Sequence, residues 1–180
     1  MSTPRRPRSC GARVALSLTA VTAASLLSLG ASCKVTKPTS DNTPPKVTWH
    51  VVRRPSNAQL TFSPSGTVHV PAGESLAINC TVEDPQGVQK ISLGGGGAYT
   101  CLNGDIGQTT NFDLASDVQN LHPNANNEVL TKIFLLKTVN PDDWTCKQGY
   151  SFSGGSLTLI CTGENYFGGV TTGQLTISRP

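Results

Sequence analysis

Cysteine is the residue type in this sequence with the widest choice of covalent chemistry. A thiolate can act as a nucleophile or a metal ligand, and two thiols in an oxidising compartment form a disulfide. The 180-residue chain carries six: Cys10, Cys33, Cys80, Cys101, Cys146 and Cys161. None belongs to a CxxC pair, and the three histidines are scattered along the chain, so the spacing disfavours a zinc site.

Acidic residues are the second group that could do chemistry. Five of them are expected at strand ends: Glu83, Asp84, Asp142, Asp143 and Glu164. Calcium needs six or more oxygens, usually from a dense Asp/Asn loop, and no such run is present in the sequence. Neighbouring acids at turns are typically solvated, and the sequence contains neither a GxSxG nor an HExxH motif. We therefore expect no enzyme activity, no metal and no cofactor.

The N-terminus has the three parts of a secretory signal. Arg5, Arg6, Arg8 and Arg13 precede an uncharged run over residues 14–29, and small residues follow. The run is short and rich in Ala, Ser and Thr, whereas a membrane-spanning helix needs about 20 strongly apolar residues. Residues 1–32 are thus predicted to be a signal peptide that is removed on export.

The last residues of this segment read Leu29-Gly30-Ala31-Ser32-Cys33. The stretch resembles the lipobox of bacterial lipoproteins. That resemblance implies acylation of Cys33, which would become the new N-terminus and attach the protein to the bacterial cell membrane or outer membrane. The alternative is cleavage by the ordinary signal peptidase, which would leave a soluble secreted protein.

Residues 33–45 are polar and rich in Pro and Thr, a composition typical of an extended tether. Removing the four arginines of the signal leaves ten basic against eleven acidic side chains, so the basic balance of the full chain disappears. No basic patch remains to bind phosphates, and nucleic acid is not an expected partner.

Four cysteines remain after Cys10 is discarded and Cys33 is acylated, and an even number in an exported protein indicates two disulfides. Alternating apolar residues put Cys80 and Cys161 on the buried faces of two strands. This favours a bridge between Cys80 and Cys161 across a core, with Cys101–Cys146 nested inside. Local pairing, Cys80–Cys101 and Cys146–Cys161, is the alternative.

Short apolar or alternating runs between turn signals predict one all-β sandwich domain over residues 46–180. The expected strands are residues 47–52, 59–62, 67–70, 75–82, 88–93, 129–139, 156–162 and 173–178. Strands 59–62 and 67–70 are expected to pair with each other, and so are the last two. Trp49 and Trp144 are expected to pack in or beside the core.

Three places in this pattern resemble the immunoglobulin-like domains of bacterial surfaces. They are the entry strand after Thr43-Pro44-Pro45, the Cys80 strand leading to Asp84-Pro85-Gln86-Gly87-Val88, and the closing segment from residue 156. The resemblance implies an immunoglobulin-like β-sandwich. Residues 102–128 fit no strand of that pattern and are predicted to be a loop insertion, and the four glycines at 94–97 a flexible connection.

These features predict a cell-envelope lipoprotein whose domain binds or scaffolds. Its partners would be the membrane, through the lipid anchor, and an envelope protein or glycan. Loops on a rigid sandwich commonly carry binding, so the predicted loop with Phe112, Leu114, Leu121 and His122 is the expected recognition surface. A secreted carbohydrate-binding or enzyme-accessory module and a purely structural envelope protein are the alternatives.

Overall fold

The computed structural model describes residues 43–180. The predicted signal peptide, the lipidation site Cys33 and the tether up to residue 42 lie outside the described residues. Within residues 43–180, no helix is long and apolar enough to span a membrane.

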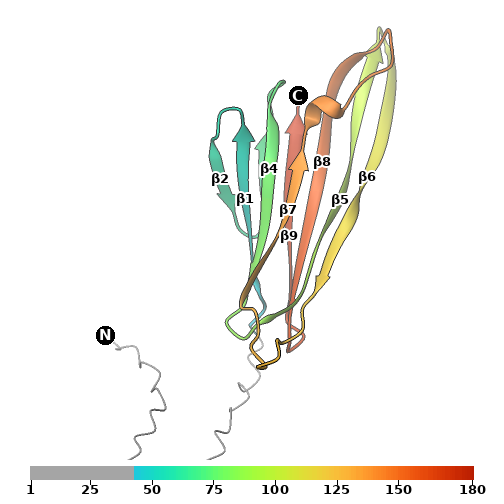
Figure 1. Ribbon diagram of the computed structural model, residues 1–180. Helices are drawn as coiled ribbons and strands as arrows, with labels where there is room; N and C mark the ends of the chain where they lie inside the picture. Colours follow the sequence, from blue (N-terminus) through green and yellow to red (C-terminus); the bar gives the residue numbers. More distant parts are fainter. Residues whose placement is uncertain (1–42) are drawn as a thin grey trace, which may run out of the picture. The chain divides into compact units, whose positions relative to one another are not determined.

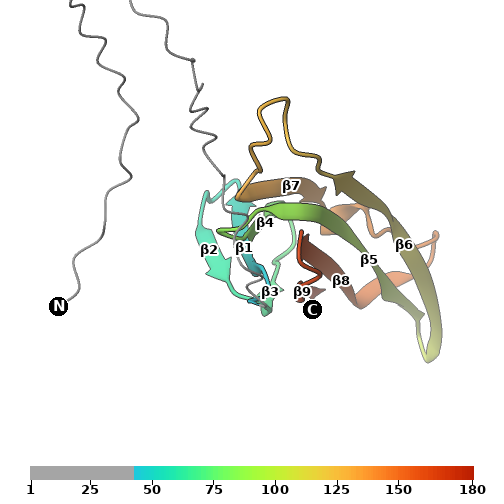
Figure 2. The same ribbon diagram turned by 90° about the horizontal axis from the view of Figure 1, so that it is seen from below.

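The described chain forms two packed antiparallel-rich sheets (Figures 1 and 2). Its elements are β1 (Lys46–Arg54), β2 (Gln59–Phe62), β3 (Gly66–His69), β4 (Ser75–Glu83), β5 (Val88–Asn103), β6 (Ile106–Asn120), β7 (Lys132–Val139), the 3-10 helix η1 (Pro141–Asp143), β8 (Ser151–Asn165) and β9 (Val170–Arg179). The first sheet, sheet A, has the order β2-β1-β4-β7, and sheet B has the order β3-β9-β8-β5-β6.

Alternation of apolar and polar residues explains why these segments form strands and which face each one buries. In β1, Val47, Trp49 and Val51 point inward and are at most 1% exposed. They lie on the same sheet face as Ile78, Cys80 and Val82 of β4, and Leu157, Leu159, Leu175 and Ile177 of sheet B complete the core. The predicted all-β sandwich is confirmed, whereas its assignment as immunoglobulin-like stays a prediction.

Two disulfides connect the parts of the sandwich. Cys80–Cys161 joins β4 of sheet A to β8 of sheet B through the core, where both residues have no exposed surface. Cys101–Cys146 joins the end of β5 to the segment between β7 and β8. The nested pairing favoured by the sequence is therefore confirmed.

Strands β2 and β3 do not pair with each other, and that prediction was wrong. Strand β2 pairs with β1 in sheet A, whereas β3 runs parallel to β9 in sheet B. The turn between them crosses from one sheet to the other, and it is fixed there because Trp49 Nε1 donates a hydrogen bond to the Pro64 carbonyl at 2.8 Å.

Two predicted irregular segments are sheet. Residues 106–120 form β6, so the predicted loop insertion at 102–128 is reduced to a short hairpin turn and the connection 121–131. The glycines at 94–97 lie inside β5 and pair with β8 on one side and, from Gly95 onward, with β6 on the other. The expectation of a flexible glycine connection was wrong, because the strand continues through these residues to Asn103.

Candidate functional site

The two sheets differ in length. Strands β5, β6 and β8 have 16, 15 and 15 residues, whereas no strand of sheet A has more than 9. At about 3.3 Å per residue, β5 spans roughly 50 Å and the longest strand of sheet A roughly 30 Å. The upper ends of β5, β6 and β8 therefore extend past sheet A (Figure 1).

The long hairpin ends at the pole opposite to the one where the described chain begins. At the entry pole, the Asn165 side-chain amide donates to the Thr43 carbonyl at 3.1 Å, and Val88 at the start of β5 pairs with Asn165. Strand β5 then runs the length of the molecule before the chain turns. We call the far end the distal tip, which comprises residues 102–107 of the hairpin and the adjacent residues 145–150.

The turn at the distal tip is a tight one. Asn103 pairs with Ile106, which leaves only Gly104 and Asp105 in the loop. Gly104 has a φ of 58°, a conformation that glycine adopts without steric cost and that two-residue hairpin loops require at their first position.

A disulfide and an aromatic cluster support the tip from its inner side. Cys101–Cys146 holds residues 145–150 against the hairpin, and the Tyr99 hydroxyl donates to the Thr145 carbonyl at 3.1 Å. Below them, Tyr99 stacks on Trp144 and on Phe152, with ring centroids 6.5 and 6.4 Å apart. Phe112 of β6 packs on Trp144 with centroids 5.6 Å apart. This cluster replaces sheet A as the inner cover of the extended part of sheet B.

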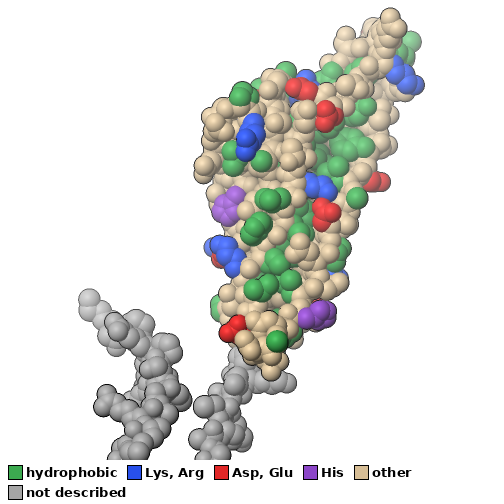
Figure 3. All heavy atoms as spheres, viewed as in Figure 1, with side chains coloured by type: hydrophobic (Ala, Val, Ile, Leu, Met, Phe, Trp, Pro, Cys, Tyr) green, Lys and Arg blue, Asp and Glu red, His purple; other side chains and the backbone are tan. Residues whose placement is uncertain are grey.

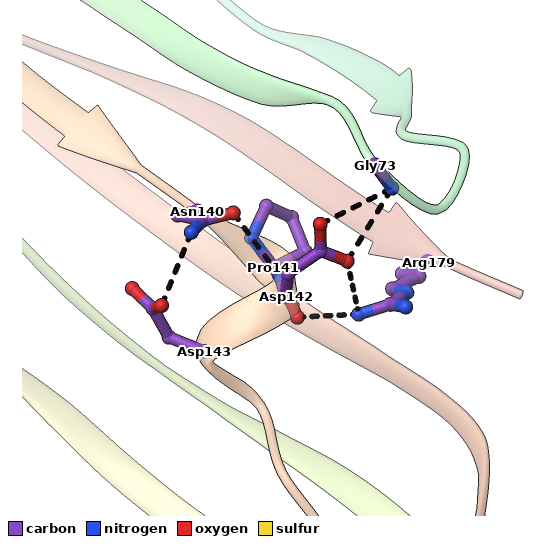
Figure 4. Close-up of polar contacts among 6 residues, drawn as sticks. All are labelled: Gly73, Asn140, Pro141, Asp142, Asp143 and Arg179. Carbon is purple, nitrogen blue, oxygen red and sulfur yellow. Dashed lines mark hydrogen bonds and ion pairs between the residues drawn. The ribbon is translucent and has the colours of Figure 1, made fainter.

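The helix η1, which starts the segment 140–150, is fixed by polar contacts (Figure 4). Arg179 Nη1 lies 3.0 Å from Asp142 Oδ1 and donates to the Pro141 carbonyl at 2.6 Å. The Gly73 amide donates to Asp142 Oδ2 at 3.2 Å, and Asn140 caps the helix by accepting from the Asp142 amide. These contacts join the last strand, the turn before β4 and the segment that supports the tip.

Two aliphatic side chains are exposed at the distal tip, one on each face of the hairpin, because Leu102 pairs with Gly107 whereas Ile106 pairs with Asn103. Leu102 is 39% exposed and Ile106 is 65% exposed. Asp105 and Lys147 are exposed beside them. In Figure 3, hydrophobic side chains gather over the extended part of sheet B and reach the end of the hairpin. Exposed aliphatic side chains on a rigid projection are available to contribute apolar contact area to a partner.

The five acids considered for calcium fall into two groups. Glu83, Asp84 and Glu164 belong to the entry pole, whereas Asp142 and Asp143 belong to η1. Asp84 is buried and accepts hydrogen bonds from the Gln86 amide and the Asn165 side chain. Within residues 43–180, no three His, Cys, Asp or Glu side chains are grouped so that they could hold a metal ion.

Glu83 is the acid whose titration is most clearly affected. A hydrogen bond from Lys132 lowers the pKa of the Glu83 carboxyl, and the charges of Lys132, Lys46 and His50 act in the same direction. Burial acts in the opposite direction and is second in size only to that hydrogen bond, and the net effect is a lowered pKa of Glu83.

The residues of the predicted recognition loop do not form one surface. Phe112 and Leu114 are half-buried and pack against the core. Leu121 and His122 instead line a shallow pocket of about 280 Å³ at the entry pole, together with Gln89, Lys90, Asn120 and Glu164. The placement of Trp49 and Trp144 is confirmed, since they are 0% and 8% exposed.

Sequence reasoning missed Leu102 and Ile106. The signal that could have found them is Gly104-Asp105, since a Gly-Asp pair between two strand-like segments is typical of a two-residue hairpin loop.

No protein-family model matches this chain, and no curated protein is significantly similar to it. Its function is therefore argued from the geometry and chemistry of the distal tip.

Proposed function

We propose that this protein is an exported binding module of the cell envelope, anchored through Cys33, which recognises a protein partner with its distal tip. The observation that carries the proposal is the stapled hairpin that extends past sheet A and presents Leu102 and Ile106 to solvent. The proposal keeps the predicted class of function, narrows the recognition surface from residues 102–128 to residues 102–107, and adds residues 145–150 to it.

The position of the tip supports this function. A chain anchored at Cys33 enters the domain at the pole near Thr43, and the tip lies at the opposite end of β5 (Figure 1). Strand β5 spans roughly 50 Å, and an extended tether from residue 33 to 45 adds up to about 40 Å. The exposed aliphatic residues would thus be held away from the anchoring membrane.

A protein partner fits the tip better than a glycan does. Glycan-binding surfaces commonly present exposed aromatic rings, whereas Tyr99, Phe112, Trp144 and Phe152 pack against one another below the tip. The exposed large side chains of the tip are aliphatic, and aliphatic contacts supply affinity through burial of apolar area.

Those two side chains can supply a substantial part of a binding energy. Full burial of a Leu or Ile side chain is worth about 1.5–3 kcal/mol. Scaled by exposure, Ile106 would contribute about 1–2 kcal/mol and Leu102 about 0.6–1.2 kcal/mol. Placing a carboxylate at position 106 removes the first contribution and adds a charge that the interface must desolvate.

The experiment is saturable binding of the detergent-extracted protein to isolated cell envelopes. We expect Ile106→Asp to weaken binding at least tenfold. The matched control is Ile160→Asp, because Ile160 is 41% exposed on β8, away from the tip. Equal binding by both variants, or an equal loss in both, would refute recognition by the tip.

Anchoring is tested separately by the intact mass of the membrane-extracted protein with and without reductant. We expect a mature chain that begins at acylated Cys33 and gains four hydrogens on reduction of its two disulfides. A mature start at any other residue would end the lipoprotein proposal, and the binding experiment would still stand.

A further inference from the structure

Among the described residues, four strands lie at sheet edges. Three of them have features that hinder pairing with a strand of another molecule. Unpaired strand edges attract other strands, and natural proteins limit this with short edge strands, Lys, Pro or bulges. Strands β2 and β3 have only four residues each. Strand β7 carries Lys132 and Lys137 within eight residues. The fourth edge strand, β6, is different.

Strand β6 is long, and over most of its length it has none of the features that usually prevent edge pairing. Its 15 residues include no Lys, Arg or Pro, and it pairs on one side only, with β5 (Figure 1). Its one irregularity lies opposite Gly94, where the register shifts between Leu93 and Gly95, so residues 106–114 are regular.

Only two charges lie on this strand, and one of them is already paired. Asp117 forms an ion pair with Lys137 of β7 at 2.8 Å. Asp113 is exposed, and its carboxylate lies beside Gly96, which has no side chain that could contact it. Between residues 108 and 111 the edge carries only Gln, Thr and Asn, whose side chains hydrogen-bond readily to an adjacent strand.

We propose that the free edge of β6 pairs antiparallel with β6 of a second copy of this chain. The pairing is centred on Phe112, so that Asn111 of each copy lies opposite Asp113 of the other. Sheet B then becomes one continuous ten-stranded sheet across a two-fold axis. This inference concerns the edge of the domain and does not depend on recognition by the distal tip.

Self-complementarity is the reason for choosing a second copy as the partner. A two-fold axis makes the contact Asn111–Asp113 occur twice, and each Asn111 amide can donate to the opposite carboxylate. A register centred on Asp113 would instead place two carboxylates directly opposite each other, which is destabilising. Antiparallel pairing also places each distal tip near the entry pole of the other copy, so two paired copies anchored in one membrane would not both hold their tips away from it.

Charge substitutions at position 111 test the pairing. Dissociation of the dimer is measured for the full mature protein in detergent, by sedimentation velocity over a range of protein concentrations. Asn111→Asp puts a carboxylate opposite Asp113 on both sides of the axis, and we expect a dimer dissociation constant about tenfold higher. Asn111→Lys puts an ammonium group opposite it, and we expect tighter association. A purely structural role of Asn111 would not give opposite effects for the two charges.

Gln174 provides the controls, since it is exposed on β9, in the interior of the same sheet. Gln174→Asp and Gln174→Lys change the net charge equally and should leave dissociation unchanged. A wild-type protein that stays monomeric at every concentration overturns the proposal, as do equal effects of the Asn111 and Gln174 variants.

A cross-linking experiment tests the register. Differently tagged Asn111→Cys and Asp113→Cys proteins are mixed and oxidised mildly, and the products are separated without reductant. We expect the mixed cross-link to exceed either self cross-link. Dominance of a self cross-link, or no cross-link at all, overturns the pairing of Asn111 with Asp113.

Discussion

Replacing Gly97 by alanine tests whether the four-glycine run is closely packed sheet. A Cβ built on Gly97 would lie 2.3 Å from the Ser156 carbonyl oxygen and 2.9 Å from the Leu157 Cα. Both atoms belong to the backbone of β8, which is paired on both sides, so no side-chain rotation can relieve the contact. The two strands must therefore separate locally for the variant to fold.

The expected loss of stability depends on which atoms the new Cβ would meet. Overpacking a core typically costs about 1–3 kcal/mol, and a backbone obstacle in an interior strand belongs at the upper end of that range. Alanine offsets about 0.5–1 kcal/mol of this because it restricts the unfolded chain more than glycine does. We expect a net loss of about 2 kcal/mol in the free energy of unfolding, or roughly 6–10 °C in Tm for a domain of this size.

Gly94 provides a matched control in the same run. A Cβ at Gly94 would meet Ser116 at 3.2 Å, where a shift of a few tenths of an ångström suffices. We expect Gly94→Ala to lie within about 0.5 kcal/mol of the wild type. Guanidinium unfolding of the oxidised mature protein, followed by Trp49 and Trp144 fluorescence, measures both. Equal stability of the two variants would refute the packing argument.

Three other perturbations have definite expected outcomes. Asn165→Ala removes a buried hub of hydrogen bonds at the entry pole, and we expect it to lower the free energy of unfolding by about 2–4 kcal/mol in the same assay. Replacing Cys101 and Cys146 by alanine opens a link over 45 residues, worth at most about 4 kcal/mol by chain entropy. Hydrogen exchange should then rise in the tip and its support while β1 and β4 stay protected, and a uniform rise would contradict the assigned role. The lowered pKa of Glu83 means that its ion pair stabilises the fold above about pH 4.5 and is lost as pH falls through that lowered pKa. Since both side chains are largely exposed, the loss should stay below about 1 kcal/mol and vanish in Lys132→Met.

The sequence predicted the parts of the fold in which one strand face is buried and the other is solvated. Alternation in β1 and β4 is strong because Trp49 and Ile78 face a covered core. The same alternation placed Cys80 and Cys161 on buried faces, and it therefore favoured the nested pairing of the four cysteines over local pairing. In these segments, local pattern and tertiary packing agree.

Strand β6 could not be predicted in the same way, because much of it lacks an opposing sheet. Of its apolar residues, only Phe112 and Leu114 are half-buried, and they pack where aromatic side chains and the edge of the core replace sheet A. Because sheet A does not cover much of β6, apolar and polar residues alternate only weakly along this strand. Deletion of residues 102–128 would remove this whole strand, so substitutions at the tip are the appropriate test of binding.

The extra length of sheet B also explains why the second disulfide lies where it does. A sandwich with two sheets of equal length covers itself, but the upper part of β5 and β8 has no strand of sheet A against it. The segment 140–150 supplies that cover, with Trp144 as its buried anchor, and it is held by Cys101–Cys146. Without the bond, the Arg179–Asp142 ion pair, hydrogen bonds and ring contacts would hold a segment that contains a single 3-10 turn. The shape of the tip should therefore depend on oxidation, which is consistent with the proposed export and would make the proposed recognition by the tip specific to the mature, oxidised protein.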